Sequence, residues 1–153
     1  MTTINPYLTF QGNSEEAFNF YRAVFGSEFA YISRFKEMPE NPQYPISEAD
    51  KEKIMHVALP ISNETVLMGS DTSEAFGASI VEGTNISISI NADSVEEVTR
   101  IFNELSANGK IKMSLNKTFW GAYFGMFIDK FGIHWMVNCE LTEHKDFEKN
   151  NAK

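Results

Sequence analysis

The sequence predicts an α+β fold of two βαβββ modules, whose strands form a concave mixed sheet with the helices on its outer side. Strand-like and helix-like segments follow one another in the same order twice along the 153 residues. The two predicted helices begin about 80 residues apart, and each follows a strand and a capping residue and precedes a glycine. Because one module cannot cover a curled sheet alone, we expect the two to combine around a pocket on the concave side.

Alternating residues predict the first strand at Ile4–Gln11. Apolar residues at helical spacing predict a helix over Asn13–Phe25. Asn13 can cap this helix with Glu16 as its capping-box partner, and Gly26 suits a left-handed residue at its end. The rest of the module is predicted as strands at Glu28–Met38, Lys53–Ile61 and Thr65–Gly69, with a proline-rich exposed loop at Pro39–Asp50.

The second module begins with the strictly alternating segment Asn85–Ala92, which places Ile86, Ile88 and Ile90 on one strand face. Asp93 or Ser94 can cap the second helix, which we expect to end at Gly109. The predicted apolar stripe of this helix consists of Val95, Val98, Ile101, Phe102 and Leu105. The last three strands are expected at Lys110–Leu115 and on both sides of a turn at Asp129–Gly132.

The charge pattern excludes some classes of partner. The formal net charge is −8, and the 13 Lys and Arg residues form no cluster. Nucleic acids and anionic membranes are therefore not expected partners, since phosphate contacts need concentrated positive charge. Cys139 is the single cysteine and the N-terminal segment has no signal-peptide pattern, so we expect a cytoplasmic protein.

Four motifs carry a resemblance to a known family: NPYL at 5–8, AFNFYRAVFG at 17–26, TFWG at 118–121 and DKFGIHWMVN at 129–138. With these motifs the chain resembles the PhnB-like branch, often labelled with a 3-demethylubiquinone-9 3-methyltransferase domain, of the vicinal oxygen chelate superfamily. That superfamily includes glyoxalase I, bleomycin-resistance proteins and extradiol dioxygenases. The resemblance implies a homodimer and one glyoxalase-like domain over residues 1–143, with modules at about 4–72 and 84–141 and a polar tail over 144–153.

The resemblance also indicates where a metal would bind. Metal-dependent relatives carry one His or Glu ligand on each of four strands, and the matching positions here fall near Asn5 or Tyr7, Met68, Asn85 and Met136. None of these residues is a His, Asp or Glu, and a thioether is a poor ligand for Zn, Ni, Mn or non-haem Fe. We therefore expect no metal. No glycine-rich loop follows the first strand either, so no nucleotide-like cofactor is expected.

Aromatic and methionine side chains are the leading candidates for ligand contact. The predicted ligand-binding residues are Trp120, Phe119, Tyr7, Met68, Tyr123, Met136 and His134. Phe124 and Phe127 could stack a planar ligand too, or all these rings could fill the cavity themselves. His134 and His56 are the candidate catalytic residues, since imidazole exchanges protons near neutral pH, but each is also compatible with a purely structural role.

These observations leave three functions open. The first is a metal-free protein that binds a small aromatic or amphipathic molecule, as bleomycin-resistance proteins do. The second is a metal-dependent or histidine-dependent enzyme, such as a lyase, isomerase or dioxygenase. The third is a structural or regulatory module whose cavity has no ligand.

Overall fold

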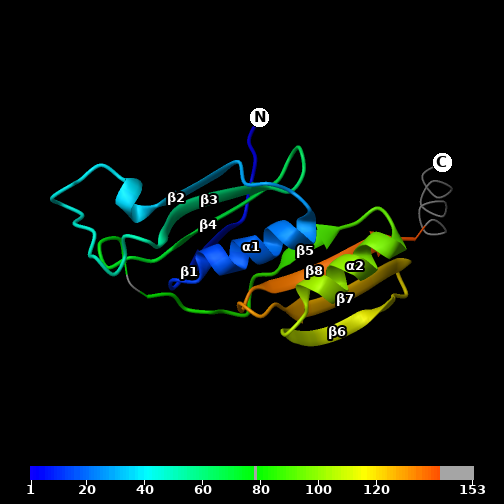
Figure 1. The fold of residues 1–153 in the computed structure, drawn as a ribbon. Helices are drawn as coiled ribbons and strands as arrows, with labels where there is room; N and C mark the ends of the chain where they lie inside the picture. Colours follow the sequence, from blue (N-terminus) through cyan, green and yellow to red (C-terminus); the bar gives the residue numbers. More distant parts are fainter. Residues whose placement is uncertain (78, 142–153) are drawn as a thin grey trace. The chain divides into compact units, whose positions relative to one another are not determined.

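The computed structural model describes residues 1–77 and 79–141, and it divides the chain into two compact units, Met1–Val81 and Glu82–Lys153. Each unit contains one α-helix and a four-stranded mixed sheet in the order βαβββ (Figure 1). The predicted α+β class with two βαβββ modules is therefore confirmed. The predicted polar tail over 144–153 lies outside the described residues.

The elements of the first unit are β1 (Tyr7–Phe10), α1 (Ser14–Phe25), β2 (Tyr31–Arg34), the short 3₁₀ helix η1 (Phe35–Glu37), β3 (Ile54–Pro60) and β4 (Val66–Asp71). Those of the second unit are β5 (Ile88–Asn91), α2 (Val95–Leu105), β6 (Lys110–Lys117), β7 (Ala122–Ile128) and β8 (His134–Glu140).

The two sheets share one topology. The strand order is β1-β4-β3-β2 in the first and β5-β8-β7-β6 in the second. In each sheet the first strand of the unit pairs in parallel with the last, and the other neighbouring strands are antiparallel. The sequence repeat is therefore a repeat of topology.

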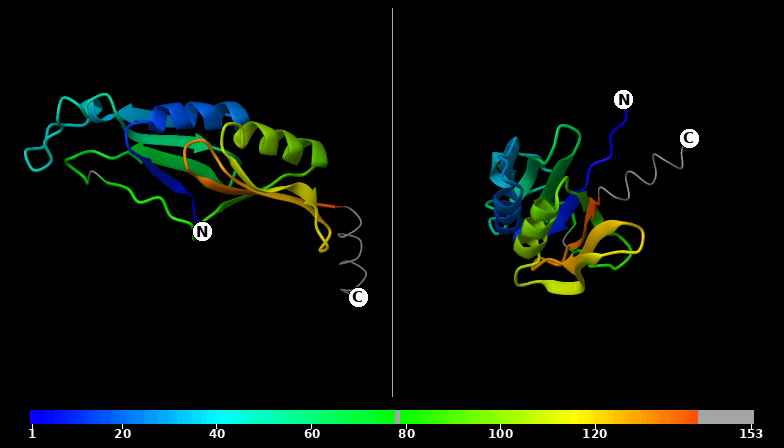
Figure 2. Two further views of the ribbon diagram at one scale, coloured as in Figure 1. Left: turned by 90° about the horizontal axis from the view of Figure 1, so that it is seen from below. Right: turned by 90° about the vertical axis from the view of Figure 1, so that its right-hand side faces the viewer.

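Each helix packs against one face of its own sheet, as the left view of Figure 2 shows. In the first unit, Phe18 and Tyr21 of α1 are buried together with Val57 and Leu67 of the sheet. In the second unit, the ring of Phe102 on α2 meets the ring of Phe127 edge to face, with centroids 5.3 Å apart. Burial of these apolar faces is the main stabilising contribution to each unit. The opposite face of each sheet is called its open face.

A glycine in each sheet lets the helix approach closely. A Cβ atom on Gly69 would lie 2.6 Å from a ring carbon of Phe18, and one on Gly125 would lie 2.7 Å from a ring carbon of Phe102. Neither position leaves room for a side chain. The two glycines therefore fix how deeply each phenylalanine ring sits in the sheet.

The cap of α1 differs from the prediction. Asn13 occupies the N-cap position, but its side chain makes no capping hydrogen bond, so the predicted capping box with Glu16 is wrong. Oδ1 of Asp71, at the end of β4, instead accepts hydrogen bonds from the backbone N–H groups of Gly12 and Ser14, each at 2.9 Å. Gly26 takes the predicted left-handed conformation, with φ of 65°.

The cap of α2 is partly as predicted. Ser94 accepts a hydrogen bond from the N–H of Glu97 at 3.1 Å. At the other end, the left-handed residue is Asn108, with φ of 60°, and not Gly109. A side chain does not fit at Gly109, because a Cβ atom there would lie 2.2 Å from the carbonyl oxygen of Ile128.

Several strand boundaries also differ. β2 ends at Arg34 and continues as η1, where the sequence predicted one strand over Glu28–Met38. The pairing of β2 with β3 shifts between Ser33 and Arg34, which ends the regular ladder there. β5 begins at Ile88, so Ile86 lies before the strand and is exposed. In the described ranges, no helix is both long enough and apolar enough to cross a membrane.

Candidate functional site

The open face of the first sheet carries a row of side chains that crosses all four strands. Tyr7 is in register with Met68, Met68 with Ala58, and Ala58 with Tyr31. Facing residues on neighbouring strands lie on the same face of a sheet. The sequence-predicted residues Tyr7 and Met68 are therefore direct neighbours on this face.

His56 joins the two tyrosines of this row. The Tyr7 hydroxyl and His56 Nδ1 lie 3.3 Å apart, within hydrogen-bond distance, and the imidazole tautomer decides which atom donates. The rings of Tyr7 and His56 are stacked with centroids 5.7 Å apart, and the Tyr31 ring lies at the same distance from His56 on a tilt. Tyr7, Tyr31 and His56 thus form an aromatic cluster with two phenol hydroxyls and an imidazole.

A buried hydroxyl lies next to this aromatic cluster. Ser33 of β2 is in register with His56, and its side chain is 5% exposed. Its Oγ has no hydrogen-bond partner among the described residues. Since buried polar groups normally make hydrogen bonds, the Ser33 hydroxyl is available for a further hydrogen bond beside His56.

The open face of the second sheet is rich in thioethers. Met136 of β8 is in register with Met126 of β7, and Met126 with Met113 of β6. These three residues are called the methionine row. Met136 was predicted from the sequence, whereas Met113 and Met126 were missed. The alternation in Ala122–Ile128 was the available signal, since it places Phe124 and Met126 on one face.

Aromatic rings lie at one end of the methionine row. Trp120, in the turn before β7, contacts the ring of Phe124 with centroids 5.9 Å apart. The Phe119 ring meets Trp120 edge to face at 5.0 Å. Trp120 is 45% exposed and Phe119 is 98% exposed. No hydrogen-bond acceptor for the Trp120 indole N–H is found in the part of the chain that the structure describes. These rings can therefore stack with a ligand, and the indole can donate to it.

Polar groups border the methionine row on both sides. On one side, Asn138 donates to Asn91 at 3.3 Å. On the other side, His134 is in register with Ile128 and is partly exposed on the open face. This second face thus combines an apolar centre with a polar border, which is typical of small-molecule sites.

Other sequence-predicted residues lie away from the open face. Tyr123 is in register with Cys139, on the side of the sheet that packs against α2. Phe127 is fully buried on that side with Trp135. Cys139 is buried there too, as its strand position indicates. The structure therefore places Met136 and His134 on the open face, Trp120 against Phe124 at its end with Phe119 beside it, and Tyr123 on the other face.

The positions expected from the sequence to match the metal ligands of relatives carry no imidazole or carboxylate. The side chain of Asn5 is engaged, since its Oδ1 accepts a hydrogen bond from the backbone N–H of Val66 at 2.9 Å. Within the described ranges no three His, Cys, Asp or Glu side chains group in a way that could hold a metal ion. The thioethers of Met68 and Met136 do not fit the metals used by the superfamily.

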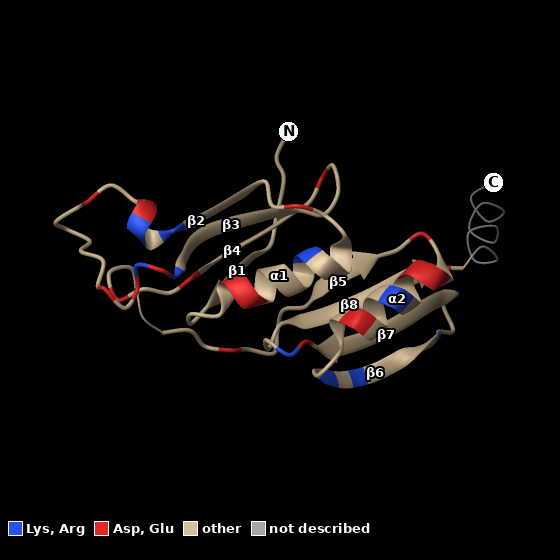
Figure 3. Cartoon of the chain, viewed as in Figure 1, with Lys and Arg blue, Asp and Glu red and all other residues tan. Residues whose placement is uncertain are grey.

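Formal charge is sparse on the strands of both faces. β1, β3, β5 and β7 contain no Lys, Arg, Asp or Glu, whereas the edge strand β6 carries Lys110, Lys112 and Lys117 (Figure 3). The shifted pKa values belong to ion pairs elsewhere. A hydrogen bond from Lys53 lowers the pKa of Asp50, and Asp50 in turn raises the pKa of Lys53. On α2, a hydrogen bond from Arg100 lowers the pKa of Glu97. The methionine row at the centre of the second open face is therefore uncharged, while Lys110, in register with Ile128, lies at the edge of that face.

Comparisons with known proteins identify the family. The family model described as 3-demethylubiquinone-9 3-methyltransferase matches residues 2–138. Protein YjdN of Escherichia coli K12 is 33% identical over 141 residues, which cover 88% of this chain and 93% of YjdN.

Solved structures agree with this match. The crystal structure of protein PA1353 from Pseudomonas aeruginosa has a TM-score of 0.78 and 41% identity, covering 92% of this chain and 99% of that one. The PhnB protein of Bacillus cereus has a TM-score of 0.71 and 27% identity, covering 90% and 99%. A glyoxalase/bleomycin resistance/dioxygenase family enzyme from Burkholderia phytofirmans shares the fold with a TM-score of 0.60, at 14% identity and coverage of 90% and 97%. The chain therefore belongs to the 3-demethylubiquinone-9 3-methyltransferase family, and it has the fold seen in the glyoxalase/bleomycin resistance/dioxygenase family enzyme.

Proposed function

We propose that this protein is a metal-free small-molecule-binding protein of the glyoxalase/bleomycin-resistance type, and that its ligand is aromatic or amphipathic. The observation that carries the proposal is the open face of the second sheet. The methionine row, Phe124 and the half-exposed Trp120 offer an apolar surface without formal charge. Thioethers adapt to ligands of different shape, and rings stack on planar groups.

The chemistry of the side chains favours binding without a metal. The matching positions fall near Asn5 or Tyr7, Met68, Asn85 and Met136, and the methionines among them suit an apolar ligand better than a divalent ion. Elemental analysis of the purified protein checks this point. We expect less than about 0.1 equivalent of Zn, Ni, Mn or Fe per chain, since these ions need imidazole or carboxylate ligands. About one equivalent would reverse the proposal.

Methyl transfer is not part of this proposal. A nucleotide-like cofactor commonly uses the loop and helix N-terminus after the first strand. Here the N-terminus of α1 is capped by the carboxylate of Asp71, which accepts from Gly12 and Ser14. That internal carboxylate occupies the donors that a phosphate group would use.

We also propose that the protein acts as a cytoplasmic homodimer. Cys139 is buried and is the one cysteine of the chain, so the fold requires no oxidising environment. Dimer formation follows the family resemblance. Light scattering after size-exclusion chromatography should give twice the mass of 17.4 kDa. A mass of one chain would contradict this part of the proposal.

A binding assay with two matched lysine variants tests the proposal. The assay measures thermal shifts across a panel of aromatic and amphipathic metabolites. Met126→Lys places a charge in the centre of the methionine row, and Asn103→Lys adds the same charge at an exposed position of α2. We expect Met126→Lys to abolish the shifts and Asn103→Lys to keep them. Equal shifts in both variants would show that the ligand binds elsewhere.

One observation favours a histidine-dependent enzyme as the second candidate. The contact of 3.3 Å between Tyr7 and His56 Nδ1 would let a proton move between phenol and imidazole. In that case His56→Gln would remove turnover of a panel compound while its binding persisted. A His56→Gln variant with normal turnover would exclude this role.

A further inference from the structure

The loop between η1 and β3 encloses a pocket that lies apart from the open-face residues described above. The pocket has a volume of about 580 Å³, within the range of small-molecule sites. Its lining comes from residues 35–51 and from Phe76, all within the first unit. Most of the lining is apolar, and prolines at 39, 42 and 45 contribute to it.

Backbone hydrogen bonds hold the base of this loop together. The N–H of Phe35 donates to the carbonyl of Lys53 at 3.1 Å, and the N–H of Lys36 donates to that of Lys51 at 3.0 Å. The buried carboxylate of Asp50 accepts from the N–H of Glu74 at 3.0 Å, which ties the loop to the segment that carries Phe76. These hydrogen bonds therefore attach the loop that lines the pocket to the rest of the first unit.

Three nearly parallel rings form a column in its wall. The Phe76 ring stacks on Tyr44 with centroids 5.0 Å apart and an angle of 14°, and on Phe35 at 6.2 Å and 19°. Phe35 is buried, whereas Tyr44 and Phe76 are about half exposed. A column of parallel rings with an exposed end suits a further planar ring, because offset stacking is favourable.

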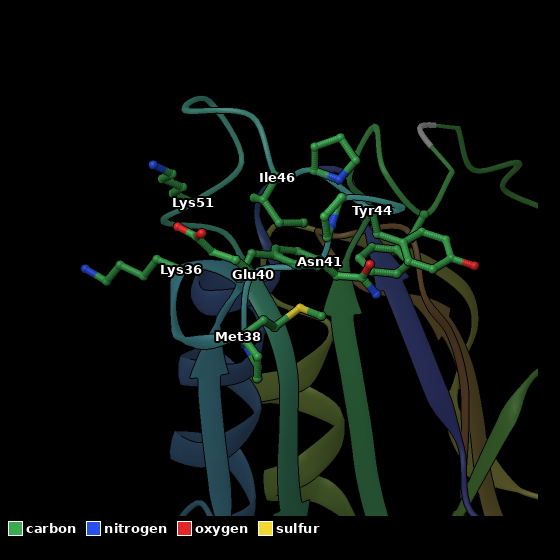
Figure 4. Close-up of a pocket in the computed structure, with 12 residues that line it drawn as sticks. Lys36, Met38, Glu40, Asn41, Tyr44, Ile46 and Lys51 are labelled. Carbon is green, nitrogen blue, oxygen red and sulfur yellow. The ribbon is translucent and has the colours of Figure 1, made fainter.

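Charged side chains gather away from this column. In the view of Figure 4, Lys36, Glu40 and Lys51 lie together on one side of the pocket and Tyr44 lies on the other. The two lysines contact exposed carboxylates, Glu52 at 2.8 Å and Glu48 at 2.5 Å. Exposed ion pairs contribute little free energy, so a ligand anion can replace those partners readily. The lining itself holds two cations, Lys36 and Lys51, and one anion, Glu40, and the carboxylates that pair with the two lysines lie outside it.

We propose that this pocket is a second binding site, and that it takes a planar aromatic anion whose ring extends the Tyr44–Phe76–Phe35 column and whose anionic group meets Lys36 and Lys51. Glu40 opposes the same anion, so its charge limits the affinity of the site. The site is independent of the function proposed above, because none of its lining residues belongs to either open face.

The test uses 2-naphthoate as probe and 2-naphthamide as its uncharged counterpart, with ¹H–¹⁵N spectra of the full chain. We expect saturable shifts at the amides of Gln43, Tyr44 and Ile46, and weaker binding of the amide. Tyr44→Ala should weaken 2-naphthoate about tenfold through lost stacking. The control Phe29→Ala removes a partly exposed ring of the first unit that contacts Arg22 of α1, outside the pocket and both open faces, and should leave the affinity unchanged.

Charge variants test the anionic end. Lys51→Gln should weaken 2-naphthoate by about threefold and Glu40→Gln should tighten it by about the same factor, the scale of exposed charge pairs. Absence of saturable shifts, or equal effects of Tyr44→Ala and Phe29→Ala, would overturn the site. Equal affinity for 2-naphthamide would overturn the anionic class of ligand. Shifts confined to the Trp120 indole would overturn this site and leave the function proposed for the second sheet standing.

Discussion

Removal of the Asp71 carboxylate should destabilise the first unit strongly. This side chain is 4% exposed at the end of β4. Its Oδ1 accepts from the N–H groups of Gly12 and Ser14, and its Oδ2 accepts from that of Ile54 at 2.9 Å. One carboxylate therefore connects the N-terminus of α1 to the beginning of β3. Asp71→Ala would leave all three donors without this acceptor.

The magnitude follows from the surroundings of each donor. The bonds from Ser14 and Ile54 are buried, whereas that from Gly12 is partly buried and water can replace its acceptor. A buried donor without a partner costs about 1–3 kcal/mol, so two of them predict a loss of roughly 2–6 kcal/mol in the free energy of unfolding. Typical total stabilities are about 5–15 kcal/mol, so the loss should be large.

Urea denaturation followed by circular dichroism measures this loss. Asp93→Ala is the matched control, because Asp93 is an exposed aspartate beside the N-terminus of α2. We expect the control to change the free energy of unfolding by less than about 0.5 kcal/mol, as surface substitutions usually do. A loss below about 1 kcal/mol in Asp71→Ala would refute the assignment of Asp71 as the cap, since a single buried donor already costs that much.

Three further predictions concern the folded state. Asp129 accepts hydrogen bonds from the Trp135 indole N–H at 2.8 Å and from two backbone N–H groups of its turn. Asp129→Asn should therefore lower the free energy of unfolding by about 1–3 kcal/mol. Urea titration measures this loss, and an unchanged midpoint would contradict it. Gly69→Ala should lower the free energy of unfolding by about 1–3 kcal/mol in calorimetry, because the added methyl group overlaps the Phe18 ring. An unchanged free energy of unfolding would mean that α1 can move aside. The Lys53 ammonium lowers the pKa of Asp50 in the folded state. The ion pair therefore stabilises the fold fully at pH values above the pKa of an unfolded Asp, about 3.9. This stabilisation is lost as the pH falls through the lower pKa of Asp50 in the folded state. At pH 7, Asp50→Asn should be less stable than the unmodified protein, and its free energy of unfolding should fall less below about pH 4. If the free energies of unfolding of both proteins change in parallel with pH, this linkage is excluded.

The sequence predicted the architecture because the repeat and the local signals agree. Apolar spacing in both helices and alternation in the strands correspond to the observed faces, and Gly26 ends α1 as expected. Such agreement between local preference and global fold is typical of natural sequences. The remaining errors arise where a distant residue replaces a local one. Asp71 caps α1 in place of Asn13, across 57 residues, and no local pattern could indicate this.

The candidate site was predictable in part for the same reason. Strand alternation alone places Met136 and His134 on one face, and the register then adds Met126 and Met113 from neighbouring strands. That register depends on which strands pair, which a single sequence does not reveal. Tyr123 was chosen as one of several clustered rings, and its register with Cys139 places it on the helix side.

The most direct test of the binding proposal is to observe the methionine methyl groups during ligand titration. The chain has seven methionines, and ¹³C-methyl labelling gives each a separate resonance. If the open faces bind an aromatic or amphipathic metabolite, a compound of the panel should shift the methyls of Met113, Met126 and Met136 in a saturable way and leave that of Met1 unchanged. If no compound shifts these three resonances, or if binding compounds shift only Met38 of the loop pocket, the proposed function of the second sheet is wrong.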